Sequence, residues 1–160
     1  MPSAATKRRT KGFDSPRQEA YLSLWRTYDR LRAIEDELFA QFDITAQQYN
    51  ALRLLRGQQK PLATLDIARR LISRAPDITR LLDKLEQRGL VSRQRVAENR
   101  RVVAVQITPA GLELLSELDG PVRRCHERQL GHLSGPQLAQ LLELLRVVRE
   151  PHEEAGGIWA

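Results

Sequence analysis

The chain has 160 residues, of which 41% are hydrophobic and 29% are charged, with a net charge of +6 and a single cysteine. This length suits one domain with a hydrophobic core rather than two independent ones, and the composition argues against bulk disorder. One cysteine excludes an internal disulfide and a cysteine-rich metal site, while the short apolar runs and the basic N-terminus exclude a membrane span and a secretory signal, so we expect a cytoplasmic protein.

The N-terminal part of the chain predicts a tail followed by one long helix. Residues 1–14 are basic and are expected to be a disordered tail. The segment Ser15–Gln18 has the order of a helix N-cap, a proline at the first helical position and a capping box. Apolar residues then recur every three or four positions as far as Phe42. The pattern predicts a helix over 15–43 with a seam of nearly coiled-coil period, which is typical of dimerisation.

The segment 44–107 predicts a helix-turn-helix followed by a hairpin. A capping box at Thr45–Gln48 opens a helix that ends at Gly57, and Thr64 is expected to cap a short helix over 65–71. After a four-residue turn, a further helix is expected to begin at Pro76. Its expected buried face consists of apolar residues, namely Ile78, Leu81, Leu82 and Leu85.

The period of the pattern changes to two after Gly89, which is well placed as the left-handed cap of the preceding helix. Alternation over 91–95 and 103–107, with a turn near 97–99, predicts a two-stranded hairpin with a basic tip. Two short helices and a basic hairpin in this order make a winged helix-turn-helix.

The C-terminal part predicts two further helices. Thr108 starts a long helix that Gly120–Pro121 should kink or interrupt, and Ser134–Gln137 opens the last one. The expected fold is mainly α with a small β-hairpin wing, in which dimerisation helices at both ends flank the winged helix-turn-helix. We divide this single domain into a tail, a dimerisation helix, a DNA-binding region, C-terminal dimerisation helices and a second tail, over residues 1–14, 15–43, 44–107, 108–150 and 151–160.

The excess positive charge is concentrated in the predicted reading region. Between Arg69 and Arg101 there are ten Arg or Lys and four Asp or Glu, and the difference of +6 equals the net charge of the chain. Such a concentration predicts double-stranded DNA as the partner. Residues near the N-terminus of the second helix reach base edges, and flanking polar or basic residues bind phosphate. The candidates are Arg74, Asp77 and Arg80 for bases, Ser73, Thr79 and Lys84 for phosphates, and Arg95, Arg100 and Arg101 for the wing in the minor groove.

A family resemblance rests on the sequence from Leu81 to Val91, followed by Arg93, Asn99-Arg100-Arg101, Thr108 and Gly111. This sequence resembles the signature of the MarR (multiple antibiotic resistance regulator) family. The resemblance runs from about Ser15 to Glu150. It implies a homodimer that binds a pseudo-palindromic operator, usually as a repressor, and releases DNA when a small phenolic or lipophilic effector binds.

One position departs from the family pattern. The resemblance makes Arg101 the minor-groove arginine. The family commonly has aspartate where this chain has Asn99, and that aspartate can orient the arginine through a salt bridge. The amide of asparagine can accept a hydrogen bond from the arginine but carries no charge to form a salt bridge, so the geometry of the wing is expected to differ.

Other candidate sites are weighed against simpler interpretations. An effector pocket could use aromatic and basic residues of the first two helices, namely Trp25, Tyr28, Arg32, Tyr49 and Arg53, although each also fits ordinary packing or a solvated surface. Cys125 fits packing better than a peroxide-sensing role. His126 and His132 lie on different helical faces, so no metal site is expected. No cofactor motif or catalytic pattern is found, and we expect no enzyme.

Three functions therefore remain open. The first is a ligand-responsive, sequence-specific regulator, most simply a repressor. The second is a non-specific architectural or nucleoid protein that uses the same basic surface. The third is a winged-helix protein-interaction module that does not bind DNA.

Overall fold

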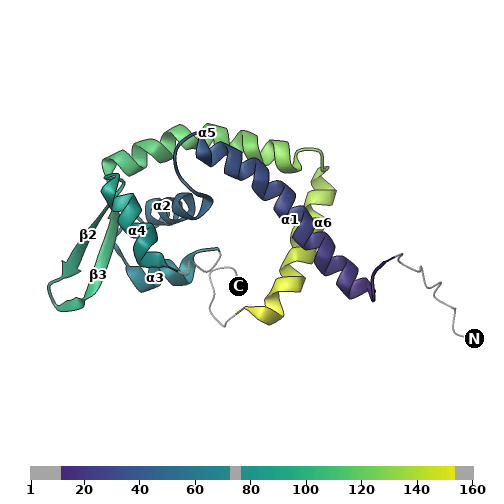
Figure 1. The fold of residues 1–160 in the computed structure, drawn as a ribbon, viewed down its shortest axis with the longest axis horizontal. Helices are drawn as coiled ribbons and strands as arrows, with labels where there is room; N and C mark the ends of the chain where they lie inside the picture. The colour runs from purple at the N-terminus through teal and green to yellow at the C-terminus, as the bar shows by residue number, and fades with distance from the viewer. Residues whose placement is uncertain (1–11, 73–76, 154–160) are drawn as a thin grey trace, which may run out of the picture.

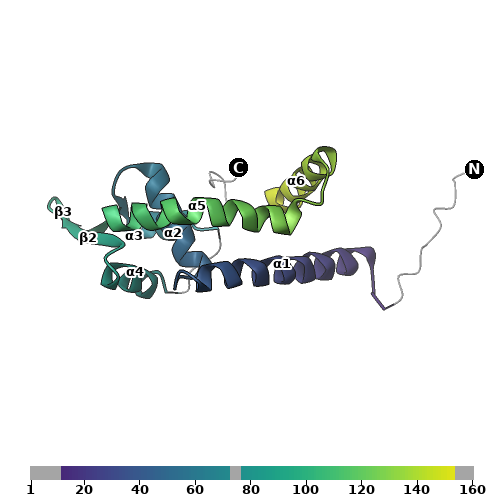
Figure 2. The same cartoon turned by 90° about the horizontal axis from the view of Figure 1, so that it is seen from above.

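The computed structural model describes residues 12–72 and 77–153, and its secondary structure is mainly helical, as the sequence predicts (Figure 1). The long helices α1 and α5 run side by side, and α6 lies at the end far from the β2–β3 hairpin (Figures 1 and 2). The helices are α1 (Pro16–Ala40), α2 (Ala46–Gln58), α3 (Thr64–Arg70), α4 (Ile78–Gln87), α5 (Pro109–Leu130) and α6 (Gly135–Arg149), followed by the 3₁₀ turn η1 (Glu150–His152).

The helix starts follow local capping chemistry, with two differences from expectation. The capping boxes at Thr45 and Ser134 are both present, and the hydroxyl of Ser15 caps α1. The side chain of Gln18 accepts a hydrogen bond from the backbone of Asp14 at 2.7 Å, so the expected capping box with Ser15 is not formed. Thr64 is wrong as an N-cap, because it is the first residue of α3 and its hydroxyl donates to the carbonyl of Val103 instead.

The sheet has three antiparallel strands rather than the expected two. The hairpin consists of β2 (Val91–Val96) and β3 (Asn99–Ile107), joined by a tight turn. The additional strand β1 (Leu62–Ala63) pairs with β3 through Leu62–Val105 and Ala63–Ala104. Two residues are too few for an alternating pattern to indicate a strand, so the sequence alone gave no signal for β1.

The sequence predicts a kink or an interruption at Gly120–Pro121; helix α5 is continuous there, so an interruption is wrong. Pro121 lies inside the helix, which arches over the rest of the molecule (Figure 1). Leu118 and Val122, on either side of the proline, pack in one apolar cluster with Phe39 and Ile44. This packing offsets the hydrogen bond that proline cannot donate.

Most of the buried apolar residues belong to the segment from α2 to β3. Its core includes Leu52 and Leu55 from α2, Ile67 from α3, Leu82 and Leu85 from α4, and Val105 from β3. The first half of α1 and all of α6 bury no residue, and no helix among the described residues is long and apolar enough to cross a membrane.

Candidate nucleic-acid interface

Helix α4 presents one face to the core and the other to solvent. Leu81, Leu82 and Leu85 are buried, as the apolar period predicts, and the partly buried Ile78 packs against the same core. Thr79, Arg80 and Lys84 are exposed. We call this exposed side the outer face of α4. A helix anchored along one side by leucines can place the other side in a major groove about 12 Å wide.

Asp77 organises the beginning of α4. The helix begins at Ile78, with Asp77 as its N-cap, and Pro76, where the sequence predicts its start, lies outside the described residues. One carboxylate oxygen of Asp77 accepts a hydrogen bond from the backbone amide of Arg80 at 2.9 Å. The sequence leaves two roles open for Asp77, a contact with a base and the orientation of Arg80. Capping of α4 is a further role that the residue pattern did not indicate. The predicted site residues Ser73 and Arg74 lie outside the described residues.

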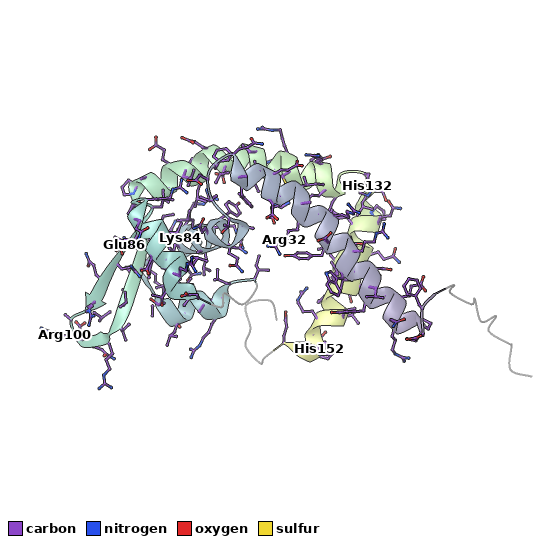
Figure 3. The ribbon with its side chains drawn as sticks, in the orientation of Figure 1. Arg32, Lys84, Glu86, Arg100, His132 and His152 are labelled. Carbon is purple, nitrogen blue, oxygen red and sulfur yellow. The ribbon has the colours of Figure 1, made fainter. Side chains whose placement is uncertain are left out.

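The wing carries its arginines at and beside the tip of the hairpin. Arg95, Arg100 and Arg101 are all exposed, and Arg100 projects beyond the end of the hairpin (Figure 3). The guanidinium of Arg95 donates to the carbonyl of Arg100 at 3.4 Å. The side-chain oxygen of Asn99 accepts from the backbone amide of Arg101 at 3.1 Å. Asn99 thus shapes the backbone next to the turn and makes no charge pair with the arginine.

Arg93 joins the wing to α4, and the sequence analysis assigned it no role. Its guanidinium donates to Glu86 through Nε at 2.9 Å and to Asp83 through a terminal nitrogen at 2.5 Å. Its backbone amide also donates to Glu86 at 3.1 Å. These hydrogen bonds, Glu86 first, raise the pKa of Arg93, so the guanidinium stays charged. We call this group the Arg93 bridge.

The sequence did contain a signal for this bridge. Arg93 lies on the same face of β2 as the buried Val91, and only 22% of its side chain is exposed. A partly buried arginine requires carboxylate partners, and two acids three residues apart lie on one side of a helix. Only the tertiary structure shows that these acids are Asp83 and Glu86.

A second junction fixes α5 against the end of α4. Gly89 has a φ of +70°, which confirms the expected left-handed cap. The hydroxyl of Thr108 donates to the carbonyl of Gly89 at 2.5 Å and caps α5 by accepting from Gly111. A Cβ atom on Gly111 would lie 2.3 Å from the carbonyl oxygen of Leu90, so the close approach of the two segments requires glycine. The junction sets the distance between α4 and α5.

A cavity of about 280 Å³ lies between the outer face of α4 and the wing. It opens between α3, α4 and both strands of the hairpin, with Thr79 of α4 and Arg101 of β3 in its lining. The lining residues are Ala63, Thr64, Leu65, Thr79, Arg93, Arg101, Val102 and Val103.

Several cations on this surface have no salt-bridge partner, whereas two of its acids are paired with an arginine. In the described part of the chain, no carboxylate forms a salt bridge with Arg80, Lys84, Arg100 or Arg101. The acids Asp83 and Glu86 are both held by Arg93. The surface therefore presents cations without a carboxylate partner, while two of its acids share a cation, which suits a polyanionic partner.

The five residues predicted for an effector pocket do not meet in one cavity of the chain. Trp25 and Tyr28 are 61% and 58% exposed on α1, where Arg32 pairs with Asp36 at 3.4 Å and lies apart from Lys84 and Glu86 of α4 (Figure 3). The ring of Tyr49 packs on Phe39 with 4.8 Å between centroids. Arg53 lines a separate cavity of about 270 Å³ between α2 and α3, which includes none of the other four.

Cys125 lies in α5 among packed side chains. It is buried, and desolvation raises the pKa of its thiol, with the charge of Glu35 acting in the same direction. The neighbouring His126 contacts Gln129 through Nδ1 at 2.9 Å. Among the described residues, no three His, Cys, Asp or Glu side chains are placed to hold a metal ion.

Comparison with known proteins adds a family to this geometry. Residues 44–103 match the model of the MarR family. A MarR transcription factor from Planctomyces limnophilus has 61% identity and a TM-score of 0.68, covering 84% of this chain and 98% of that one. A mutant E. coli MarR in complex with operator DNA has 23% identity and a TM-score of 0.74, covering 81% of this chain and 93% of that one. Bordetella bronchiseptica BpsR, whose DNA binding is regulated by 6-hydroxynicotinic acid, has 24% identity and a TM-score of 0.74, covering 81% and 98%.

Proposed function

The chain belongs to the MarR family of transcription regulators, which have a DNA-binding winged helix, and from this membership we propose that it is a homodimeric repressor released by a small effector. Its operator would be pseudo-palindromic, because two copies of α4 related by a two-fold axis would enter successive major grooves.

The observation that carries the DNA-binding part is the unequal charge pairing around α4. Arg80 and Lys84 are exposed on the outer face of α4, and Arg100 and Arg101 are exposed on the wing. None of the four forms a salt bridge with a carboxylate of the described residues. Arg80, near the helix N-terminus, is suited to bidentate contact with guanine. Thr79 and Lys84 are suited to phosphates, and the wing arginines to the adjacent minor groove.

The dimer is supported by apolar side chains that the single chain leaves in solvent. In the first half of α1 these include Tyr21 and Trp25, which are 64% and 61% exposed. On α6 they include Leu142 and Val148, which are 62% and 58% exposed. Exposed apolar surface on two long helices is typical of an oligomer interface.

Release by an effector is supported by membership of the family and by the regulation of BpsR by 6-hydroxynicotinic acid. We propose a small phenolic or lipophilic compound. Trp25 and Tyr28 lie on the exposed part of α1, so in a dimer they would border the second chain. A pocket that includes them would be completed only by dimerisation.

The test begins with selection of binding sites from a random duplex library by the wild-type protein. A repressor enriches one pseudo-palindrome, which it binds about 10³-fold or more tightly than random duplex at the same salt concentration. Absence of enrichment with retained binding would identify an architectural protein. Absence of any binding at low salt would identify a protein-interaction module.

Two exposed cations of α4 form a matched pair for assigning base reading. We expect Arg80→Ala to cost about 1–3 kcal/mol on the selected site and to relax preference at one base position. Lys84→Ala should weaken selected and random DNA alike and lower the salt slope by about one. Anisotropy titrations on both duplexes at several salt concentrations measure these effects. Retained base preference in Arg80→Ala would contradict the assignment.

A further inference from the structure

We propose that Arg93 is a positioning residue whose positive charge offsets part of the negative charge of Asp83 and Glu86, so that α4 can approach DNA with less carboxylate repulsion. The inference rests on the proposed DNA binding and deepens it. It assigns Arg93 a role through two other side chains rather than through direct contact with a phosphate.

The hydrogen bonds show how fully the two acids occupy Arg93. Both oxygens of Glu86 are used, one by the backbone amide of Arg93 and the other by Nε and a terminal nitrogen at 2.9 and 2.6 Å. The same terminal nitrogen reaches Asp83 at 2.5 Å. Only 22% of the Arg93 side chain is exposed, compared with 45% for Asp83 and 38% for Glu86. The acids therefore lie nearer to solvent than the cation that holds them.

This arrangement lowers the negative charge that α4 presents to DNA. Asp83 and Glu86 lie on the same helix as Arg80 and Lys84, and Figure 3 shows Glu86 towards the hairpin. Two unpaired carboxylates there would repel the phosphates that the neighbouring cations attract, and juxtaposed like charges cost several kcal/mol. Arg93 reaches them from β2, so the same contacts hold the wing at a fixed position beside α4.

The alternative is that Arg93 itself binds a phosphate and the acids merely hold it in place. The two roles predict opposite effects when the acids are neutralised. If the role of Arg93 is to offset the negative charge of the acids, the double variant Asp83→Asn with Glu86→Gln binds DNA as tightly as wild type or more tightly. If the acids position Arg93 for a phosphate, the same double variant binds DNA more weakly.

The decisive comparison is made in an Arg93→Met background, measured as affinity for the selected duplex by anisotropy. Arg93→Met alone should weaken binding about tenfold or more, because the two acids lose their partner. Adding Asp83→Asn and Glu86→Gln should restore affinity to within about threefold of wild type. A triple variant that stays as weak as Arg93→Met would overturn the proposal, as would an Arg93→Met variant with wild-type affinity.

A matched control separates local neutralisation from total charge. Glu113→Gln and Glu117→Gln in the Arg93→Met background remove the same number of charges from exposed acids of α5 that make no salt bridge to Arg93. Equal rescue by this control would overturn the proposal. If urea unfolding shows that Arg93→Met does not fold, the double and triple variants decide the question alone. Failure of wild type to bind DNA would instead refute the proposed function.

Discussion

Two regions of the molecule differ in how far their apolar residues are buried. The first, which we call the reading region, is the segment from α2 to β3. The second, which we call the arms, consists of the first half of α1 and α6. In the first, Leu52, Leu82 and Val105 are each 0% exposed. In the second, Tyr21 and Leu142 are more than 60% exposed. The first region is completed by contacts within one chain, whereas the second retains apolar surface that folding of one chain does not bury.

This difference separates two requirements of the proposed repressor. The reading region must hold α4 and the wing in one arrangement, which internal packing and the Arg93 bridge can provide. The arms must place two reading regions at a fixed separation, which requires a second copy. Helix α5 connects the two, because its first half packs on the reading region and its second half extends beside α1.

The largest expected effect comes from removing a buried side chain in the reading region. Leu82→Ala deletes a fully buried leucine from α4 and should lower the free energy of unfolding by about 2–5 kcal/mol. Urea unfolding at constant protein concentration measures the loss. Leu65→Ala, at a leucine that is 68% exposed, is the control and should change stability little. An equal loss of unfolding free energy in both variants would contradict the difference in burial between Leu82 and Leu65.

A charge on α6 tests the second region and should act on association rather than on folding. Leu142→Glu places a carboxylate at a leucine that is 62% exposed in the single chain. If that leucine is buried between two chains, the dimer should weaken by about 2–4 kcal/mol, or roughly 30-fold to 1,000-fold. Sedimentation velocity across a dilution series measures this change.

The matched control is Leu65→Glu, which introduces the same charge at an equally exposed leucine of α3. Its association should equal that of wild type. If wild type and Leu142→Glu both sediment as monomers, the proposal of a dimer is wrong. If Leu142→Glu remains a dimer, this part of α6 does not belong to the interface.

The smallest effect concerns an ion pair between α2 of the first region and α5, the helix that connects the two regions. Arg56 of α2 donates two hydrogen bonds to Asp119 of α5, at 2.9 and 3.0 Å, and the arginine holds the pKa of the aspartate below its ordinary value. Because the folded pKa is lowered, the stabilisation is present above the unfolded pKa and is lost as pH falls through the folded pKa. Both side chains are partly exposed, so Asp119→Asn should cost only about 0–1 kcal/mol at neutral pH.

Urea unfolding of wild type and Asp119→Asn as a function of pH measures this contribution. The difference in unfolding free energy between the two proteins should be constant near neutral pH and should shrink in the acid range, below the ordinary aspartate pKa of 3.8. Glu153→Gln provides a control at another partly exposed acid, whose ion pair with Arg149 lies away from the contact between α2 and α5. A difference that grows as pH falls would contradict the assigned sign.

The local signals in the sequence predicted most helix starts and the division of α4 into two faces. Thr45 and Ser134 cap their helices as expected, because a cap depends on residues within one turn. Thr64 did not follow its local signal, since β1 precedes it directly and its hydroxyl is directed to Val103 on a distant strand. Pro121 did not end its helix, because packing of Leu118 and Val122 outweighed the local preference.

The sequence by itself determined the order of the elements, the buried face of α4 and the concentration of positive charge, because each depends on residue type and short-range spacing. Only the tertiary structure decided which charges on the reading surface are available. Arg93 was one of ten cations in a basic segment, and the chain had to fold before it paired with Asp83 and Glu86 across a strand and a helix. Tertiary structure also separated the leucines that are buried within one chain from those left exposed on α6, since a hydrophobic period predicts an apolar face but not what covers it.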